Sequence, residues 1–211
     1  MAHADLRHHN ETMSTNLGSV ETPAAILDLD AAEANIKMAV TRVRAACPPG
    51  TRVPMLRPHV KSHKTPTLAL LQIELSDGLT VGVCCQKTDE AVAMCKSGVV
   101  DILLSNEVVD PRKLARLAAL VVQGAAIRLL VDDAGAASAA SDAAAAAGVV
   151  IGVLIEVDVG HHRCGVAGPA EAVSLANVIA TLPGLRFDGI QAYHGMAQHV
   201  RTIAARREIG A

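Results

Sequence analysis

The alternation of strand-like and helical segments limits the folds open to this chain. Apolar runs of strand length alternate with segments of helical apolar spacing along most of the sequence. Strands and helices that alternate in this way form parallel sheets with right-handed crossovers. The runs are continuously apolar, as expected for strands buried on both faces. Strands are predicted at 53–60, 79–85, 99–105, 126–131, 149–157 and 185–193, and helices at 66–76, 88–97, 111–123, 133–147 and 169–181.

Local signals mark several helix ends. Asp30 is predicted to be an N-cap, with Glu33 three residues later completing a capping box. Asp110 and Pro111 are typical of another helix start. The stretch from Ala134 to Ala147 is almost entirely small residues, which is compatible with low complexity. The helix propensity of alanine and the flanking strands favour a helix there.

Two architectures fit this pattern, a doubly wound open sheet and a (β/α) barrel. No G-x-G-x-x-G or Walker motif follows the first strand, which weakens the nucleotide-binding open sheet. Polar groups follow nearly every strand, as in barrels whose active sites lie at the carboxyl ends of the strands. We therefore predict an α/β fold, a TIM-type (β/α)8 barrel that is incomplete, with about six of the eight strands present. The polar groups are Lys61, Gln86, Lys87, Ser105, Asn106, Asp132, the run from Asp158 to Arg163, Tyr193 and His194.

The predicted barrel stops in the helix after its sixth strand. An open barrel leaves unpaired strand edges and an exposed interior. Two explanations are considered, a fragment of a longer protein and a barrel completed by another chain, and the fragment is favoured. Residues 1–20 are predicted to be a disordered polar tail, and residues 21–211 the partial barrel.

Charge and cysteine content exclude several classes of partner. The net charge of -2 provides no basic excess for nucleic acid or an acidic membrane surface. No apolar run approaches the roughly 20 residues of a membrane span. The five cysteines match no zinc spacing and indicate free thiols in a reducing compartment, the cytoplasm or an organelle. Cys84 and Cys85 are interpreted as small buried core residues.

A basic cluster, Arg57–Lys64, follows the first predicted strand. One interpretation is a solvated loop whose charges face water. The other is a lysine, Lys61, held at the end of a barrel strand, where its amine can form an imine with an aldehyde cofactor.

Six sequence segments occur in order between residue 22 and the C-terminus: Thr22–Asp30, Arg57–Lys64, Gly82–Lys87, Asp101–Glu107, Glu156–Gly165 and Gln191–Gly195. Together they resemble the D-threonine aldolases. These enzymes and the D-serine dehydratases belong to the alanine racemase-like pyridoxal-phosphate enzymes. A series of motifs in register is far more specific than any one motif alone.

The resemblance implies a pyridoxal 5'-phosphate barrel of alanine racemase type, followed by a C-terminal β-domain that is absent here. It implies that Lys61 forms the internal aldimine and is the catalytic lysine. It places Arg163 near the phenolic oxygen of the cofactor, and Gln191 and Tyr193 near its ring or the substrate. His59, beside the lysine, is a further candidate cofactor-binding residue.

The resemblance also implies the reaction. A D-3-hydroxy amino acid such as D-threonine is cleaved between Cα and Cβ, giving glycine and an aldehyde. The alternatives are dehydration of the D-serine type, giving an α-keto acid and ammonia, and a non-catalytic cofactor-binding fragment. The family's divalent metal, Mn or Zn, has its ligands beyond residue 211, so no metal ligand is assigned. The full-length enzyme is expected to be a homodimer.

The individual residues also have simpler interpretations. His59 and His63 suit either a supporting role around Lys61 or ordinary loop hydrogen bonding. Their spacing of four at a strand exit, with a lysine between them, suits a metal poorly. Arg163 suits a surface loop, although loops at this face of a barrel carry function. Tyr193 suits the core.

Overall fold

The computed structural model describes residues 17–210, and the chain divides after Asn35 into two units. In the first unit, η1 (Leu17–Ser19) precedes the start of α2 (Leu29–Ala46). The predicted N-cap at Asp30 is wrong. The cap lies two residues earlier, at Asp28, whose carboxylate accepts the backbone N–H of Ala31 at 2.9 Å, and helix α2 therefore begins at Leu29. Of the predicted N-terminal tail, residues 1–16 lie outside the described residues.

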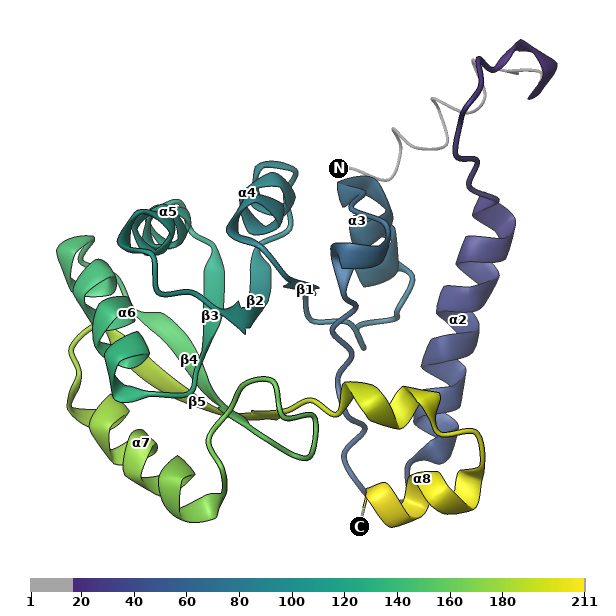
Figure 1. Ribbon diagram of the computed structural model, residues 1–211. Helices are drawn as coiled ribbons and strands as arrows, with labels where there is room; N and C mark the ends of the chain where they lie inside the picture. Colours follow the sequence, from purple (N-terminus) through teal and green to yellow (C-terminus); the bar gives the residue numbers. More distant parts are fainter. Residues whose placement is uncertain (1–16, 211) are drawn as a thin grey trace. The chain divides into compact units, whose positions relative to one another are not determined.

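The second unit is built on a five-stranded sheet (Figure 1). Its spatial order follows the chain, β1-β2-β3-β4-β5, and every neighbouring pair is parallel. A doubly wound sheet reverses its strand order partway, whereas a barrel does not. The prediction of an incomplete barrel is confirmed. The strands are β1 (Val83–Cys85), β2 (Asp101–Glu107), β3 (Ala126–Val131), β4 (Ile151–Val157) and β5 (Leu185–Ala192).

The segment 53–60, predicted as the first barrel strand, forms no regular strand. It makes only two isolated parallel bridges, Leu56 with Thr80 and His59 with Cys84. Pro54 lies within this segment, as does the proline before His59, and prolines have no backbone N–H to donate to a ladder. The prediction of six strands is therefore corrected to five strands and one bridged segment.

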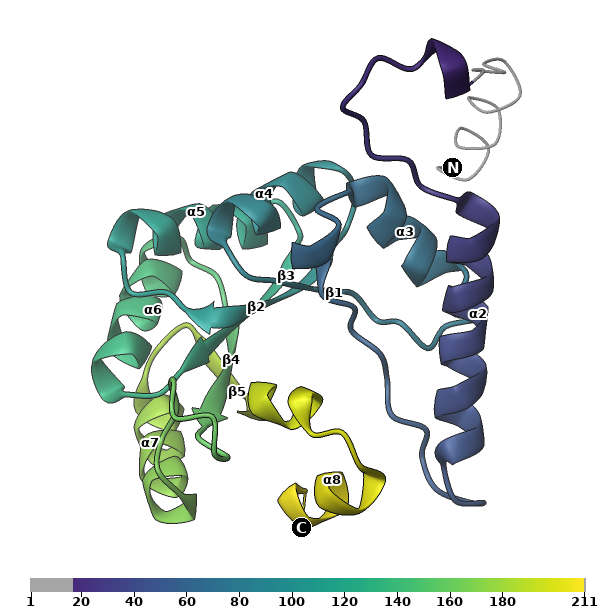
Figure 2. The ribbon, with the colours of Figure 1, turned by 45° about the vertical axis from the view of Figure 1, so that its right-hand side comes forward.

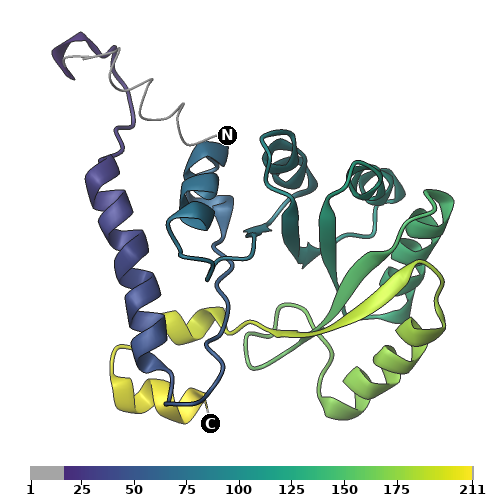
Figure 3. The ribbon, with the colours of Figure 1, turned by 180° about the vertical axis from the view of Figure 1, so that it is seen from behind.

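The predicted helices are confirmed to within a few residues at each end. Helices α4 to α7 follow one another along the outer side of the sheet, as two further views show (Figures 2 and 3). The alanine-rich stretch is a helix, α6, whose N-cap Asp133 accepts two backbone N–H groups. No helix within residues 17–210 is both long and apolar enough to cross a membrane. The helices are α3 (Pro66–Glu74), α4 (Thr88–Lys96), α5 (Pro111–Val122), α6 (Ala134–Ala146), α7 (Pro169–Thr181) and α8 (Ile203–Ile209), with η2 (Val60–Ser62) and η3 (Gly195–His199).

The hydrophobic core lies between the sheet and these helices. Alternate strand residues are almost fully buried, which is the period of two expected when one face of a strand packs against helices. Strand β5 is different. Phe187 and Ile190 are exposed, and no described strand pairs with its outer edge. The strand residues that belong to this helix-facing core are Val83, Cys85, Ile102, Leu104, Ile127, Leu129, Val131, Ile151, Val153 and Ile155.

The opposite face of the sheet carries a chain of ion pairs. Asp101 accepts hydrogen bonds from Arg57 and Arg128, each at 2.7 Å. Arg128 also donates to Asp188 at 2.9 Å. These bonds connect the bridged segment, β2, β3 and β5 across the inner face. Gly152 leaves space for this network, because a side chain there would collide with Asp188 and Arg128.

Candidate functional site

A pocket of 340 Å³ lies at the carboxyl ends of the strands. Its volume is within the range of small-molecule sites, roughly 300–1,000 Å³. All five predicted catalytic and cofactor-binding residues line it, although they come from segments far apart in the sequence. Their chemical roles stay predictions. The lining residues are Arg57, His59, Lys61, Cys84, Gln86, Ser105, Asn106, Arg163, Gln191, Ala192 and Tyr193.

Other polar groups predicted at this end of the sheet do not line that pocket. Lys87 is the N-cap of α4. Asp132 lines a different pocket, Asp158 folds back on its own loop, and His194 precedes η3. The parallel sheet brings these residues to one edge, but their side chains point to different places.

The interpretation of the cysteine pair as core is half correct. Cys85 is fully buried, and its pKa is raised to about 12, first by burial and then by the charge of Glu90. Cys84 points to the other face and lines the pocket. Burial also raises the pKa of Cys84, which keeps its thiol protonated at neutral pH. All five cysteines are free, as predicted.

Lys61 is carried by the short 3-10 turn η2. Val60 is fully buried and anchors this turn in the core. His59 is the N-cap, and its side chain accepts the backbone N–H of Lys61. At the other end, the backbone N–H of His63 donates to the carbonyl of Val60 at 3.2 Å. The lysine backbone is thus fixed from both sides while its side chain reaches the pocket.

The two histidines beside the lysine differ in role. His59 lines the pocket, and its Nε2 lies 3.0 Å from the hydroxyl of Ser105. Burial, followed by the positive charge of Lys61, lowers the pKa of His59, so the imidazole is neutral at pH 7. His63 accepts the backbone N–H of Thr65 at 3.1 Å and does not line the pocket. His63 therefore makes only a loop hydrogen bond of this kind. His59 caps the turn of Lys61, contacts Ser105 and lines the pocket.

The far wall of the pocket is an aromatic contact. The guanidinium carbon of Arg163 lies 5.4 Å from the ring centroid of Tyr193, within cation–π range. The ring of His161 meets the same tyrosine edge-on, with centroids 5.5 Å apart. Tyr193 is 39% exposed, so it is a pocket wall and not a core residue.

The loop that carries Arg163 is held in shape by hydrogen bonds between its backbone N–H groups and the side chain of Asp158. The Asp158 carboxylate accepts the backbone N–H of His162 at 2.9 Å and of Gly160 at 3.0 Å. These bonds hold the pKa of Asp158 at about 2. Gly165 has φ 108°, and a Cβ there would lie 2.5 Å from the backbone N of Asp158. The loop is therefore a built structure that presents Arg163 to the pocket.

Glu156 was not predicted as a site residue. Glu156 is only 2% exposed. Burial, and after it the negative charge of Glu107, raises the pKa of the Glu156 carboxyl to about 7. Arg163 and a hydrogen bond with Gln191 oppose that rise, which places Glu156 close to two pocket residues. One of its carboxylate oxygens, Oε2, is buried without a hydrogen-bond partner. The available signal was a single acid within the apolar strand Ile151–Val157.

Three further ligand-type side chains lie together nearby. The ligand atoms of Glu107, Asp132 and Cys164 are all within 4.8 Å of one another. Asp132 also accepts the backbone N–H of Gly165 at 3.0 Å, which ties it to the loop of Arg163. Burial, followed by a hydrogen bond with Glu107, raises the pKa of the Cys164 thiol. The group has the donor atoms of a cation site, although no metal ligand was predicted in this chain.

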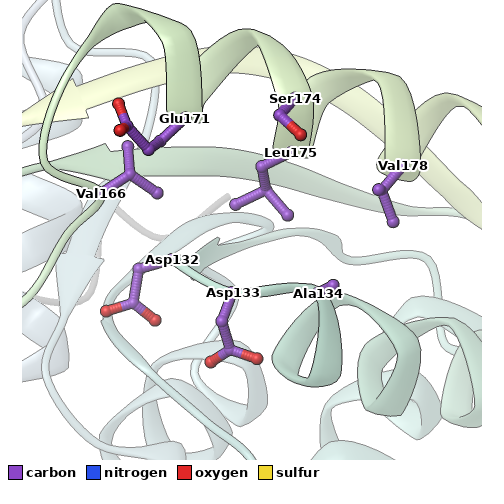
Figure 4. A pocket seen from close by; sticks show the side chains of 8 residues that line it. All are labelled: Asp132, Asp133, Ala134, Val166, Glu171, Ser174, Leu175 and Val178. Atoms are coloured by element: carbon purple, nitrogen blue, oxygen red, sulfur yellow. The ribbon is translucent and has the colours of Figure 1, made fainter.

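A second pocket, of 390 Å³, lies between the start of α6 and helix α7 (Figure 4). Its acidic groups are Asp132, Asp133 and Glu171, set around the apolar side chains of Val166 and Leu175. Its lining includes no lysine, so it offers no amine to an aldehyde cofactor.

Comparisons with known proteins agree with this geometry. The family described as alanine racemase, N-terminal domain, matches residues 27–209. The chain is 45% identical to a D-threonine aldolase of an Arthrobacter species over 92% of its length, which is 48% of that protein. It is 41% identical to a 3-hydroxy-D-aspartate aldolase of Paracoccus denitrificans over 89% of its length, or 46% of that protein. The crystal structure of D-threonine aldolase from Filomicrobium marinum superimposes with a TM-score of 0.83 at 42% identity, covering 92% of this chain and 49% of that one. The chain thus spans about half the length of the curated relatives it matches.

Proposed function

This chain belongs to the alanine racemase N-terminal domain family, and we propose that it forms the cofactor-binding part of a lyase that cleaves D-3-hydroxy amino acids. The products are glycine and an aldehyde, with D-threonine as the representative substrate. Both relatives described above are named as aldolases of D-3-hydroxy amino acids.

The observation that carries this proposal is that Lys61 and Arg163 line the same pocket. Lys61 is the one lysine among the described residues that line it, and Arg163 lines it from the loop after β4. Lysine is the side chain that condenses with an aldehyde, and arginine suits an anionic oxygen. Gln191 and Tyr193 add hydrogen-bonding groups on the same wall. This set fits the aldehyde and the phenolic oxygen of pyridoxal 5'-phosphate.

When bound, pyridoxal phosphate supplies an aldehyde for amine condensation and an electron sink for the pair released at Cα. Lys61 would hold the aldehyde end, and Arg163 would face the phenolic oxygen. Tyr193 keeps the Arg163 guanidinium in place by its ring contact. Glu156 lies behind this wall and can hold or release a proton near neutral pH, because its pKa is about 7.

The whole protein's further requirements belong to the same proposal. The divalent metal, manganese or zinc, and the homodimer follow from the resemblance, and no residue of this chain is assigned to either. Light scattering of the purified chain, with and without cofactor, measures the oligomeric state directly.

The test begins with cofactor binding. Purified chain is mixed with pyridoxal phosphate, reduced with borohydride and digested, and the pyridoxyl group is located by peptide mass mapping. We expect it on Lys61, and on no peptide of Lys61→Ala above the level found on surface lysines such as Lys113. A wild-type chain that is not labelled at Lys61 at saturating cofactor refutes cofactor binding by this chain.

Product analysis then separates the three functions. Glycine and acetaldehyde from D-threonine, with manganese present, identify an aldolase. An α-keto acid and ammonia identify the dehydratase alternative. Labelling of Lys61 without turnover of D-threonine identifies a cofactor-binding fragment.

A further inference from the structure

The hydrogen bonds around His59 determine where its proton lies. The backbone N–H of Lys61 points to Nδ1 of His59 at 3.3 Å. A backbone N–H can only donate, so Nδ1 must carry a lone pair. In a neutral imidazole the proton is then on Nε2, and this nitrogen lies 3.0 Å from Ser105 Oγ.

Ser105 completes the chain of donors. Its hydroxyl donates to the backbone carbonyl of Cys85 at 3.2 Å, so its oxygen is free to accept from the Nε2–H of His59. Each group then has one compatible role, from the Lys61 N–H through the imidazole and the hydroxyl to the Cys85 carbonyl. A protonated imidazole would direct an Nδ1–H against the Lys61 N–H and break the chain.

The charges that face His59 agree with a neutral ring. Burial and the positive charge of Lys61 disfavour protonation, while the carboxylate of Glu90 and the Cys84 carbonyl act in the opposite direction. The net direction is a lowered pKa.

The sheet places Ser105 where it can do this. Leu104 pairs with Leu129 and Glu107 pairs with the next residue of β3, so Ser105 and Asn106 have no partners in the ladder. Ser105 shares the inner face with Asp101 by the period of two, and the bulge brings Asn106 to the pocket beside it, whereas a regular strand would send the two to opposite faces.

We propose that Ser105 is a positioning residue for Lys61, acting by holding His59 as the neutral, Nε2-protonated cap of the turn that carries the lysine. The inference rests on the proposed function only for the chemical role of Lys61. The tautomer and the capped turn are properties of the protein without cofactor.

Ring ¹⁵N NMR of the cofactor-free protein tests the tautomer. We expect the His59 signals of a neutral Nε2–H ring at pH 7. In Ser105→Ala the Nε2–H loses its acceptor, and we expect a shift toward the Nδ1–H tautomer. Because a hydrogen bond of this kind contributes about 1 kcal/mol, amide exchange at Lys61 and the rate of its pyridoxyl labelling should change about 5-fold, exchange faster and labelling slower. Ser105→Thr keeps the hydroxyl and should restore both.

Two variants make the test specific. Ser62→Ala is the matched control, since the Ser62 hydroxyl contacts the His59 backbone carbonyl and not the ring; it should leave the His59 tautomer unchanged. His59→Asn keeps an oxygen that caps the Lys61 N–H but has no imidazole link to Ser105. In that background Ser105→Ala should have no further effect on labelling.

Several results would overturn the proposal. A wild-type His59 that is Nδ1-protonated or charged at pH 7 refutes it outright, whether or not the variants fold. So does an unchanged tautomer in Ser105→Ala, or a loss that persists in the His59→Asn background. A wild-type chain with the expected tautomer but no labelling at Lys61 refutes the proposed function alone.

Discussion

The Asp188 carboxylate occupies the space that a side chain at Gly152 would need. A Cβ at position 152 would lie 2.4 Å from Asp188 Oδ2, which is far inside van der Waals contact. The carboxylate cannot simply swing away, because Arg128 and Arg186 both hold it. A glycine at the second position of β4 is therefore required by the ion pair between Arg128 of β3 and Asp188 of β5.

Gly152→Ala is expected to destabilise the fold by about 1–3 kcal/mol, the usual cost of overpacking. Urea unfolding followed by circular dichroism measures it. Gly168→Ala is the control, because a Cβ there meets its nearest neighbour at 3.5 Å; its expected loss is only that of replacing the N-cap glycine of α7 by alanine, roughly half a kcal/mol. Equal stabilities of the two variants would contradict the steric argument.

Asp101→Asn should also destabilise the fold. It removes the charge shared by Arg57 and Arg128, in a place where all three side chains are mostly buried. We expect a loss of about 1–3 kcal/mol, the range for hydrogen bonds to charged groups. Asp77→Asn removes a similar pair with Arg44, but the Asp77 side chain is 81% exposed, so its loss should be small. A comparable loss in both variants would show that burial of the network is unimportant.

Stability should fall as the pH rises from about 4.5 to 7 because of Glu156. Its pKa is raised from 4.5 to about 7 in the folded protein, so the folded state holds this proton more tightly than the unfolded state. Ionisation of Glu156 costs no unfolding free energy below the unfolded pKa. The loss develops from about pH 4.5 to 7 and is at most about 3 kcal/mol above pH 7. The difference in unfolding free energy between wild type and Glu156→Gln, measured from pH 5 to 8, should change in favour of the variant. A constant difference between wild type and Glu156→Gln across this pH range would refute the shift.

The aromatic wall can be tested through cofactor affinity. Tyr193→Ala removes the ring that contacts both Arg163 and His161. A cation–π contact contributes about 0.5–1 kcal/mol at exposed sites, so pyridoxal phosphate should bind roughly 2- to 5-fold more weakly. Spectroscopic titration measures the affinity. Tyr193→Phe keeps the ring and should bind nearly as wild type does, unless the hydroxyl itself contacts the cofactor.

Much of the fold follows from sequence because its signals are local. The helix from Asp110 and Pro111 and the alanine-rich helix both begin with caps whose chemistry acts over three or four residues. Parallel order then brings the ends of the strands together. The apolar residues of the segment 53–60 predict a strand that does not form, because two prolines interrupt its hydrogen bonding.

The site is only partly predictable for a related reason. Lys61, Arg163 and Tyr193 are recognisable by residue type and motif, and they do line one pocket. The raised pKa of Glu156 depends on burial and on Glu107, and the contact of Ser105 depends on His59. Both partners are distant in the sequence, so no local pattern predicts these interactions. Glu156 and Glu107 come from different strands, and only the folded sheet places their charges close enough to interact.

The bulge in β2 separates the residues that pack the core from the residues that line the pocket. Up to Leu104, each side chain is committed to the helix-facing core or the inner face by its place in the ladder. Ser105 and Asn106 lie outside that count, so substitutions there alter the lining of the pocket without disturbing the packing beneath the helices. Because Ser105 also contacts His59, Asn106 is the position where new specificity can evolve at little cost to folding, and a library restricted to residue 106 is the natural starting point for redesigning this site.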